Sequence, residues 1–164
     1  MQKIEPFRYS AIQIALHWVT AALVLCQLFF GERVSAVIEA VEAGGSAMPT
    51  DQALVGAHYR VGISILALVA VRILVRLCSA RPLLQTPATL MNKAALATQI
   101  AFYVLLVAMP TTGLLSTYFG DPWGEFHSFA EPVLVVLIAL HAASALFQQF
   151  RLKDSTLRRM LVPN

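Results

Sequence analysis

The sequence predicts an all-α membrane protein: a four-helix bundle that forms a single domain over residues 1–164, with both termini in the cytoplasm. Composition is the first reason, because 58% of the residues are hydrophobic and only 13% are charged, about half the charged fraction of a soluble domain. Four apolar runs, each near the roughly 20 residues that a membrane-spanning helix needs, are the second reason. The uneven distribution of lysine and arginine along the chain is the third.

The first expected span covers about residues 10–30. Ser10 suits its N-cap, because a serine hydroxyl can accept a hydrogen bond from a free backbone N–H of the first turn. We expect this helix to end at Gly31 and to be followed by a loop over residues 32–51. Apolar residues at helical spacing predict a short interfacial helix over residues 34–41 within that loop.

Three further spans are expected over about residues 52–77, 90–118 and 127–150. Proline lacks a backbone N–H and clashes with the preceding turn, so Pro110 should kink the third span. Just past this kink, Gly113 would leave a surface that a neighbouring helix can approach closely. An even number of spans places both ends of the chain on the same side of the membrane.

Basic residues gather on one side of the predicted membrane. Ten of the twelve lysines and arginines fall there, whereas only Arg33 and Arg60 fall on the other side, together with seven of the nine acids. The positive-inside rule then predicts a multi-pass membrane protein with cytoplasmic termini. The same pattern accounts for the pI of about 9.1, so we expect membrane lipid around the chain and no nucleic-acid partner.

All four histidines lie in apolar segments. Fourteen residues separate His127 from His141, which on one helix puts the two side chains within about 40° of each other and roughly 21 Å apart. At about 1.5 Å per residue from the cytoplasmic helix ends, His17 lies nearly as deep as His141, and His58 lies more loosely level with His127. The sequence therefore predicts two histidine pairs, one toward each side of the membrane.

Two imidazoles that face each other across a helical bundle suit the two axial positions of a haem iron. A tetrahedral zinc site would need further ligands, and no cysteine or carboxylate is expected at the right depth. For a single membrane histidine, a hydrogen bond to a neighbouring helix is an equally good interpretation, but four at matched depths favour ligands. Bis-histidine ligation leaves no open iron position, so it favours electron transfer. Because the chain has no C-x-x-C-H motif, the haem should be bound noncovalently.

Other residues are candidate contacts of such a cofactor. Gly62, one turn after His58, either admits a porphyrin face or packs against another helix. Arg72 and Arg76 either pair with cytoplasmic haem propionates or anchor the helix end by the positive-inside rule. Arg60, a base on an acidic side, is expected to bind a propionate or another anion.

Four stretches carry a recognisable pattern: YSAIQIALHW at Tyr9–Trp18, HYRVGISILALVAVRILVRL at His58–Leu77, YVLLVAMPTTGLL at Tyr103–Leu115, and LHAASALFQQF with LKDSTLRRM near the C-terminus. With the histidine positions, they resemble the bacterial cytochrome b561 family over nearly the whole chain. The resemblance implies two b-type haems (heme b), one held by His17 and His141 and the other by His58 and His127. It also implies a place in the bacterial inner (plasma) membrane.

Members of that family are similar to superoxide oxidases, which take electrons from superoxide outside and reduce ubiquinone. The resemblance thus implies a superoxide:ubiquinone oxidoreductase, with Arg60 expected to act where superoxide or another periplasmic electron donor approaches. Gln148 and Gln149 stand where some members carry histidine, and a glutamine there can still hydrogen-bond a quinone carbonyl. Larger relatives are cytochrome subunits of hydrogenases and dehydrogenases, so a partner redox subunit is the alternative. A haem carrier or a structural bundle without activity is the third hypothesis.

Overall fold

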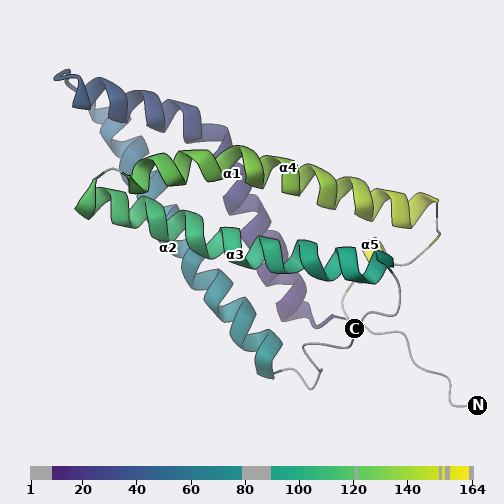
Figure 1. Cartoon of the computed structure of the whole chain (residues 1–164). Coiled ribbons are helices and arrows are strands. Elements are labelled where there is room, and N and C mark those ends of the chain that lie inside the picture. The colour runs from purple at the N-terminus through teal and green to yellow at the C-terminus, as the bar shows by residue number, and fades with distance from the viewer. Residues whose placement is uncertain (1–8, 79–89, 121, 152, 154–155, 163–164) are drawn as a thin grey trace, which may run out of the picture.

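A computed structural model describes residues 9–78, 90–120, 122–151, 153 and 156–162 of the chain. In these residues the chain forms four long helices, followed by one short helix. They are α1 (Ala11–Glu42), α2 (Pro49–Cys78), α3 (Leu90–Phe119), α4 (Trp123–Phe150) and the short α5 (Thr156–Arg159) (Figure 1). Each long helix is long and apolar enough to cross a membrane. The predicted all-α class with four spans is therefore confirmed.

The helices run alternately up and down, as short connections require. α1 packs against α2, and α3 packs against α4, while contacts between α2 and α3 join the two pairs (Figure 1). α1 begins and α4 ends at one end of the bundle, with Arg72 and Arg151 nearby, and we call it the basic end. The opposite end carries Glu32, Glu42 and Glu125, and we call it the acidic end.

The predicted end of the first helix is wrong. α1 continues through Gly31 to Glu42, so the expected loop over residues 32–51 shrinks to residues 43–48, and the expected separate helix over residues 34–41 is the last part of α1. A glycine inside a helix costs only about 1 kcal/mol relative to alanine, which packing can offset.

Packing of this kind occurs along the continued part of α1. Gly31 is buried, and a Cβ added to it would lie 3.4 Å from Oε1 of Glu131 on α4. Val34 and Val37, which follow at helical spacing, are also buried. This burial supplies packing that offsets the cost of the glycine, so the helix continues through Gly31.

Smaller differences affect the other helices. α2 begins at Pro49, three residues earlier than predicted, since proline fits the first turn of a helix, where its missing N–H has no intrahelical partner. α4 begins at Trp123 instead of residue 127, because the connection from α3 needs only residues 120–122, with Gly120 at φ +66°. Pro110 lies inside α3, as predicted, and the Thr111 hydroxyl donates a hydrogen bond of 2.7 Å to the carbonyl of Val107.

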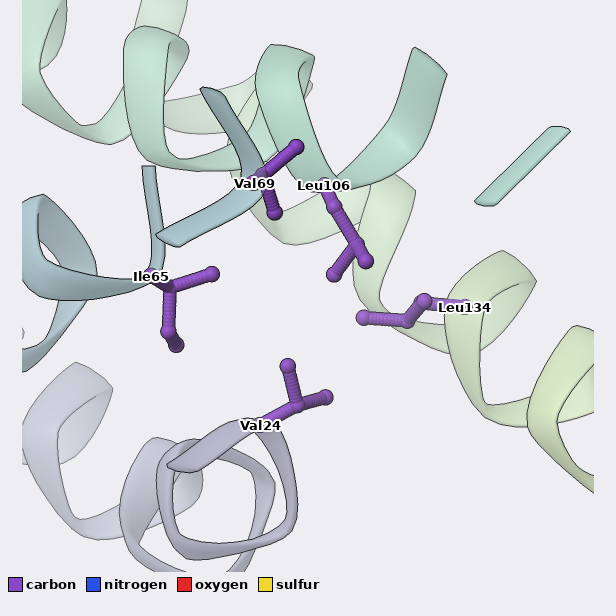
Figure 2. Packing of buried hydrophobic residues seen from close by; sticks show 5 residues of the cluster. All are labelled: Val24, Ile65, Val69, Leu106 and Leu134. Atoms are coloured by element: carbon purple, nitrogen blue, oxygen red, sulfur yellow. The ribbon is translucent and has the colours of Figure 1, made fainter. Parts of the chain in front are cut away.

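The core of the bundle is one cluster to which all four long helices contribute. Figure 2 shows the five buried side chains pointing toward one another: Val24, Ile65, Val69, Leu106 and Leu134. Val69 is completely buried, with 0% of its surface exposed. Leu134 lies midway between the two histidines of α4, seven residues from each, so this apolar cluster separates the levels of the two histidine pairs.

Candidate functional site

The structure brings the four histidines together as two pairs. Near the acidic end, the ring centroids of His58 on α2 and His127 on α4 lie 6.2 Å apart, with 77° between their planes. Near the basic end, the rings of His17 on α1 and His141 on α4 lie 6.5 Å apart at 57°. α4 contributes one histidine to each pair, which is the arrangement predicted from the helix depths.

The His127 ring is held against α3. Its Nδ1–H donates a hydrogen bond of 2.8 Å to the backbone carbonyl of Met109. The same carbonyl accepts a 3.0 Å hydrogen bond from the hydroxyl of Thr112, which is buried. With the proton fixed on Nδ1, Nε2 keeps its lone pair and is the nitrogen free to bind a metal.

Gly113 provides the space for this contact. A Cβ at this position would lie 3.0 Å from Nδ1 and 3.1 Å from Cε1 of His127. Contacts this short require the neighbour to move, and here the neighbour is a ring already hydrogen-bonded to α3. The close-approach surface predicted at Gly113 thus receives the His127 side chain.

His58 is tied to α1 through its backbone. Gln27 Nε2 donates a hydrogen bond of 2.9 Å to the His58 carbonyl, whereas the buried Nδ1 of the His58 ring has no partner among the described residues. A Cβ on Gly62 would lie 3.6 Å from Gln27 Nε2, an ordinary contact, so this glycine borders α1. Its contact with a porphyrin stays a prediction.

Aromatic and basic side chains surround the pair near the basic end. The Phe102 ring meets the His141 ring edge-on at 5.2 Å, and the Trp18 ring meets the His17 ring edge-on at 5.3 Å. Arg72 is half-buried, with Nη2 3.4 Å from Nδ1 of His17. Its guanidinium also lies 6.0 Å from the centre of the Tyr103 ring.

The predicted propionate partners differ in their surroundings. Arg72 reaches the histidine pair, whereas Arg76, one turn later and also half-buried, forms no ion pair within the part of the chain that the structure describes. Binding of a propionate by either arginine stays a prediction.

The two basic residues of the acidic end are not equivalent. Arg33 Nη2 lies 2.9 Å from Oδ1 of Asp51, so its charge is already paired. Arg60 is exposed, and its Nη1 lies 3.6 Å from the position of a Cβ on Gly56, one turn earlier in α2. Among the described residues Arg60 has no ion-pair partner. At this end, Arg60 is therefore the basic residue with an unpaired charge that can attract an anion from solution.

Polar groups gather where α4 ends. Gln148 Nε2 lies 3.3 Å from Oγ of Ser144 on its own helix. Oε1 of Gln149 is buried and has no hydrogen-bond partner in the described residues. Nearby in sequence, the Met160 carbonyl accepts a 2.8 Å hydrogen bond from Trp18 Nε1, which ties the C-terminal segment to α1.

Two contacts were missed in the sequence. Gln27 interrupts an apolar run, and an amide inside a membrane span normally finds a hydrogen-bond partner on another helix, so its isolation was a usable signal. Phe102 gave no such signal, because nothing distinguishes it from other packing aromatics until α3 and α4 are placed side by side.

The donor set fits haem iron better than a metal held by protein alone. Rings bonded to one metal ion at about 2 Å on either side would have centres about 6 Å apart, close to the observed 6.2 and 6.5 Å. No group of three or more His, Cys, Asp or Glu residues could hold a metal in the described part of the chain. Two imidazoles would suffice to hold a haem, because the porphyrin would supply the remaining ligands of the iron.

A family model described as prokaryotic cytochrome b561 matches residues 8–163. The chain belongs to the prokaryotic cytochrome b561 family. As such it is a membrane electron-transfer protein of the bacterial inner membrane, and the family implies heme b as its cofactor.

Curated relatives of this cytochrome b561 protein match over nearly their whole lengths. It is 35% identical over 156 residues to a protein named cytochrome b562 from Cereibacter sphaeroides. The match covers 94% of this chain and 96% of the relative. It is 27% identical over 178 residues to a protein named probable superoxide oxidase CybB from Yersinia pestis, with 94% and 96% covered. Cytochrome b561 homolog 1 of Escherichia coli is 28% identical over 180 residues, with 94% and 97% covered.

Proposed function

We propose that this cytochrome b561 protein binds two noncovalent b-type haems, one between His17 and His141 and one between His58 and His127, and carries electrons from the acidic end to the basic end. The observation that carries the proposal is the presence of two histidine pairs at two levels of one bundle, with ring separations of 6.5 and 6.2 Å. When bound, haem would supply one-electron transfer, and two histidines at each site would hold it.

The protein's own residues hold and separate the two sites. The histidines fix the cofactors, while the Met109 carbonyl and Gly113 fix the orientation of His127. The five side chains of the core cluster around Val69 lie between the two levels, and all five are aliphatic. We propose that the protons needed at one end come from that end.

The proposed donor is superoxide and the proposed acceptor is ubiquinone. In the net reaction, two superoxide anions each give one electron and become O₂, while one ubiquinone takes two electrons and two protons and becomes ubiquinol. The relative named probable superoxide oxidase CybB, which is 27% identical to this chain, supports this choice. The charge pattern supports an acidic end in the periplasm and a basic end in the cytoplasm, which supplies the protons.

Both substrates have candidate contacts. The exposed, unpaired charge of Arg60 would attract superoxide to the acidic end. At the other end, the buried and unpartnered Oε1 of Gln149 could accept a hydrogen bond from a ubiquinol hydroxyl, and the Gln148 amide could donate one to a quinone carbonyl. Arg72 and Arg76 are the proposed partners of the haem propionates near the cytoplasm.

The experiment has two stages. A pyridine haemochrome assay on the purified protein should give two b-type haems per chain. Stopped-flow mixing with superoxide should then reduce the haems, and ubiquinone should reoxidise them. One haem or none per chain would refute the two-site proposal. Two haems that superoxide cannot reduce would refute superoxide as the donor, while the proposal of a two-haem electron carrier would stand.

A cytochrome subunit for a partner dehydrogenase or hydrogenase is the second candidate. One observation favours it: because Asp51 neutralises Arg33, the acidic end repels an anionic donor everywhere except at Arg60. A basic redox protein would complement that surface. Rapid reduction by a basic protein donor, with none by superoxide, would support this alternative.

A further inference from the structure

We propose that the chain sets its two sites at different reduction potentials, lower at the His58–His127 site and higher at the His17–His141 site, so that electrons move downhill from the acidic end to the basic end. The proposal rests on the proposed binding of two haems. It comes from a difference in what faces Nδ1 of one histidine in each pair. A carbonyl oxygen faces His127, whereas an arginine faces His17.

The carbonyl acts on the site near the acidic end. When a histidine bound through Nε2 donates its Nδ1–H to a carbonyl, its imidazole becomes a more basic ligand. A more basic ligand stabilises ferric iron over ferrous iron and so lowers the reduction potential. The 2.8 Å bond from His127 to Met109 has this geometry, and Gly113 leaves the room for it. His58 shows no corresponding bond in the described residues.

The arginine acts on the other site in the opposite direction. A fixed positive charge disfavours the oxidised iron, which carries one more positive charge than the reduced iron, and so raises the potential. Arg72 is half-buried with Nη2 3.4 Å from His17, where solvent screens its charge only weakly. A guanidinium cannot lose its proton under physiological conditions, so this charge is permanent. When Arg72 pairs with a haem propionate, as proposed above, its charge offsets that of the propionate and still raises the potential relative to a propionate without a partner.

Arg60 does not cancel the difference. It also lies near a histidine pair and would raise the potential at the acidic end, but its side chain is exposed. Its guanidinium lies over Gly56, toward the start of α2 and away from the core. Water and salt therefore screen Arg60 far more strongly than Arg72, and Arg33 is already paired with Asp51.

A redox titration of the purified two-haem protein, followed by its visible spectrum, tests the proposal. We expect two spectral components with different reduction potentials. An electron should favour the His17–His141 site at least tenfold, which corresponds to a potential difference of about 59 mV for one electron. Single-site variants, His17→Ala and His58→Ala, assign each component to a site.

Variants at the two Nδ1 contacts then separate the two effects. Arg72→Gln should lower the reduction potential of the His17–His141 component enough to change the sharing of electrons between the two sites at least tenfold. Arg72→Lys, which keeps the charge, should lower this potential less. Gly113→Ala should raise only the reduction potential of the His58–His127 component, because the added Cβ pushes His127 away from the Met109 carbonyl. Gly31→Ala is the matched control, because its Cβ meets only the end of a side chain at 3.4 Å, and it should leave both components in place.

The order of the two reduction potentials in the wild-type protein tests the proposal even if a variant loses a haem. Equal potentials, or a higher potential at the His58–His127 site, would overturn the proposal. So would an Arg72→Gln protein that binds both haems with unchanged potentials. These outcomes differ from a failure of the proposed function, which would appear as a haem count below two or as two haems that superoxide cannot reduce.

Discussion

Reversing the charge of Arg60 tests where an anionic donor approaches. Because Arg33 is paired with Asp51, Arg60 is the base of the acidic end that remains unpaired in the described residues. Arg60→Glu changes the local charge by two units. For an anion about 8 Å away in water, each unit is worth ~0.5 kcal/mol, so the reversal costs about 1 kcal/mol before screening. An exposed side chain justifies the dielectric constant of water.

Salt then sets the size of the effect. With a Debye length of about 30 Å at 0.01 M, most of this energy survives, and reduction by superoxide should slow ~4-fold. With a Debye length of about 8 Å at 0.15 M, ~0.4 kcal/mol survives, and reduction should slow only ~2-fold. Stopped-flow measurements of haem reduction by superoxide at the two salt concentrations give both numbers.

Two controls accompany this experiment. Arg158→Glu makes the same charge reversal on an exposed side chain of α5, at the basic end, and should change reduction by superoxide little. Reoxidation of pre-reduced protein by ubiquinone should be unchanged in Arg60→Glu. A rate loss that is equal at both salt concentrations and comes with a shifted haem spectrum would mean that Arg60 holds a propionate. An unchanged rate with an unchanged spectrum would refute the approach at Arg60 altogether.

Three more predictions follow from the bundle. His17→Ala should remove one spectral haem component and His58→Ala the other, and loss of the same component by both variants would contradict the pairing. Alkaline phosphatase fused after Asn164 should be inactive if the basic end faces the cytoplasm, so high activity would reverse the orientation. Val69→Ala should lower the free energy of unfolding by about 1–2 kcal/mol through lost packing in the fully buried core, whereas Val71→Ala, on a side chain that is 43% exposed, should cost less than half as much.

Much of the fold and the histidine pairing could be predicted because both depend on regular geometry. Helix rise and apolar length fix how deep each histidine lies, so His17 and His141 come together without any knowledge of side-chain packing. The end of the first helix could not be predicted in this way. Gly31 is a weak helix residue in isolation, and only the burial of Gly31, Val34 and Val37 in the packed structure shows why the helix continues.

Contacts between side chains on different helices were the least predictable part of the site. The pairing of Arg33 with Asp51 depends on how α1 and α2 lie side by side, and it removes half of the positive charge expected at the acidic end. The contact of Arg72 with His17 likewise depends on the rotation of α2 about its axis. Spacing along one chain carries no information about such rotations until the packed faces are known.

The sharing of α4 between both histidine pairs has a consequence for how the protein is made. Chains are synthesised from the N-terminus, and helices form as they emerge. When α1, α2 and α3 have been made, His17 and His58 are both present, but each still lacks the partner that α4 supplies. Neither site is complete until the last long helix has entered the membrane. If each haem is held by its two histidines as proposed, cofactor loading follows completion of the chain.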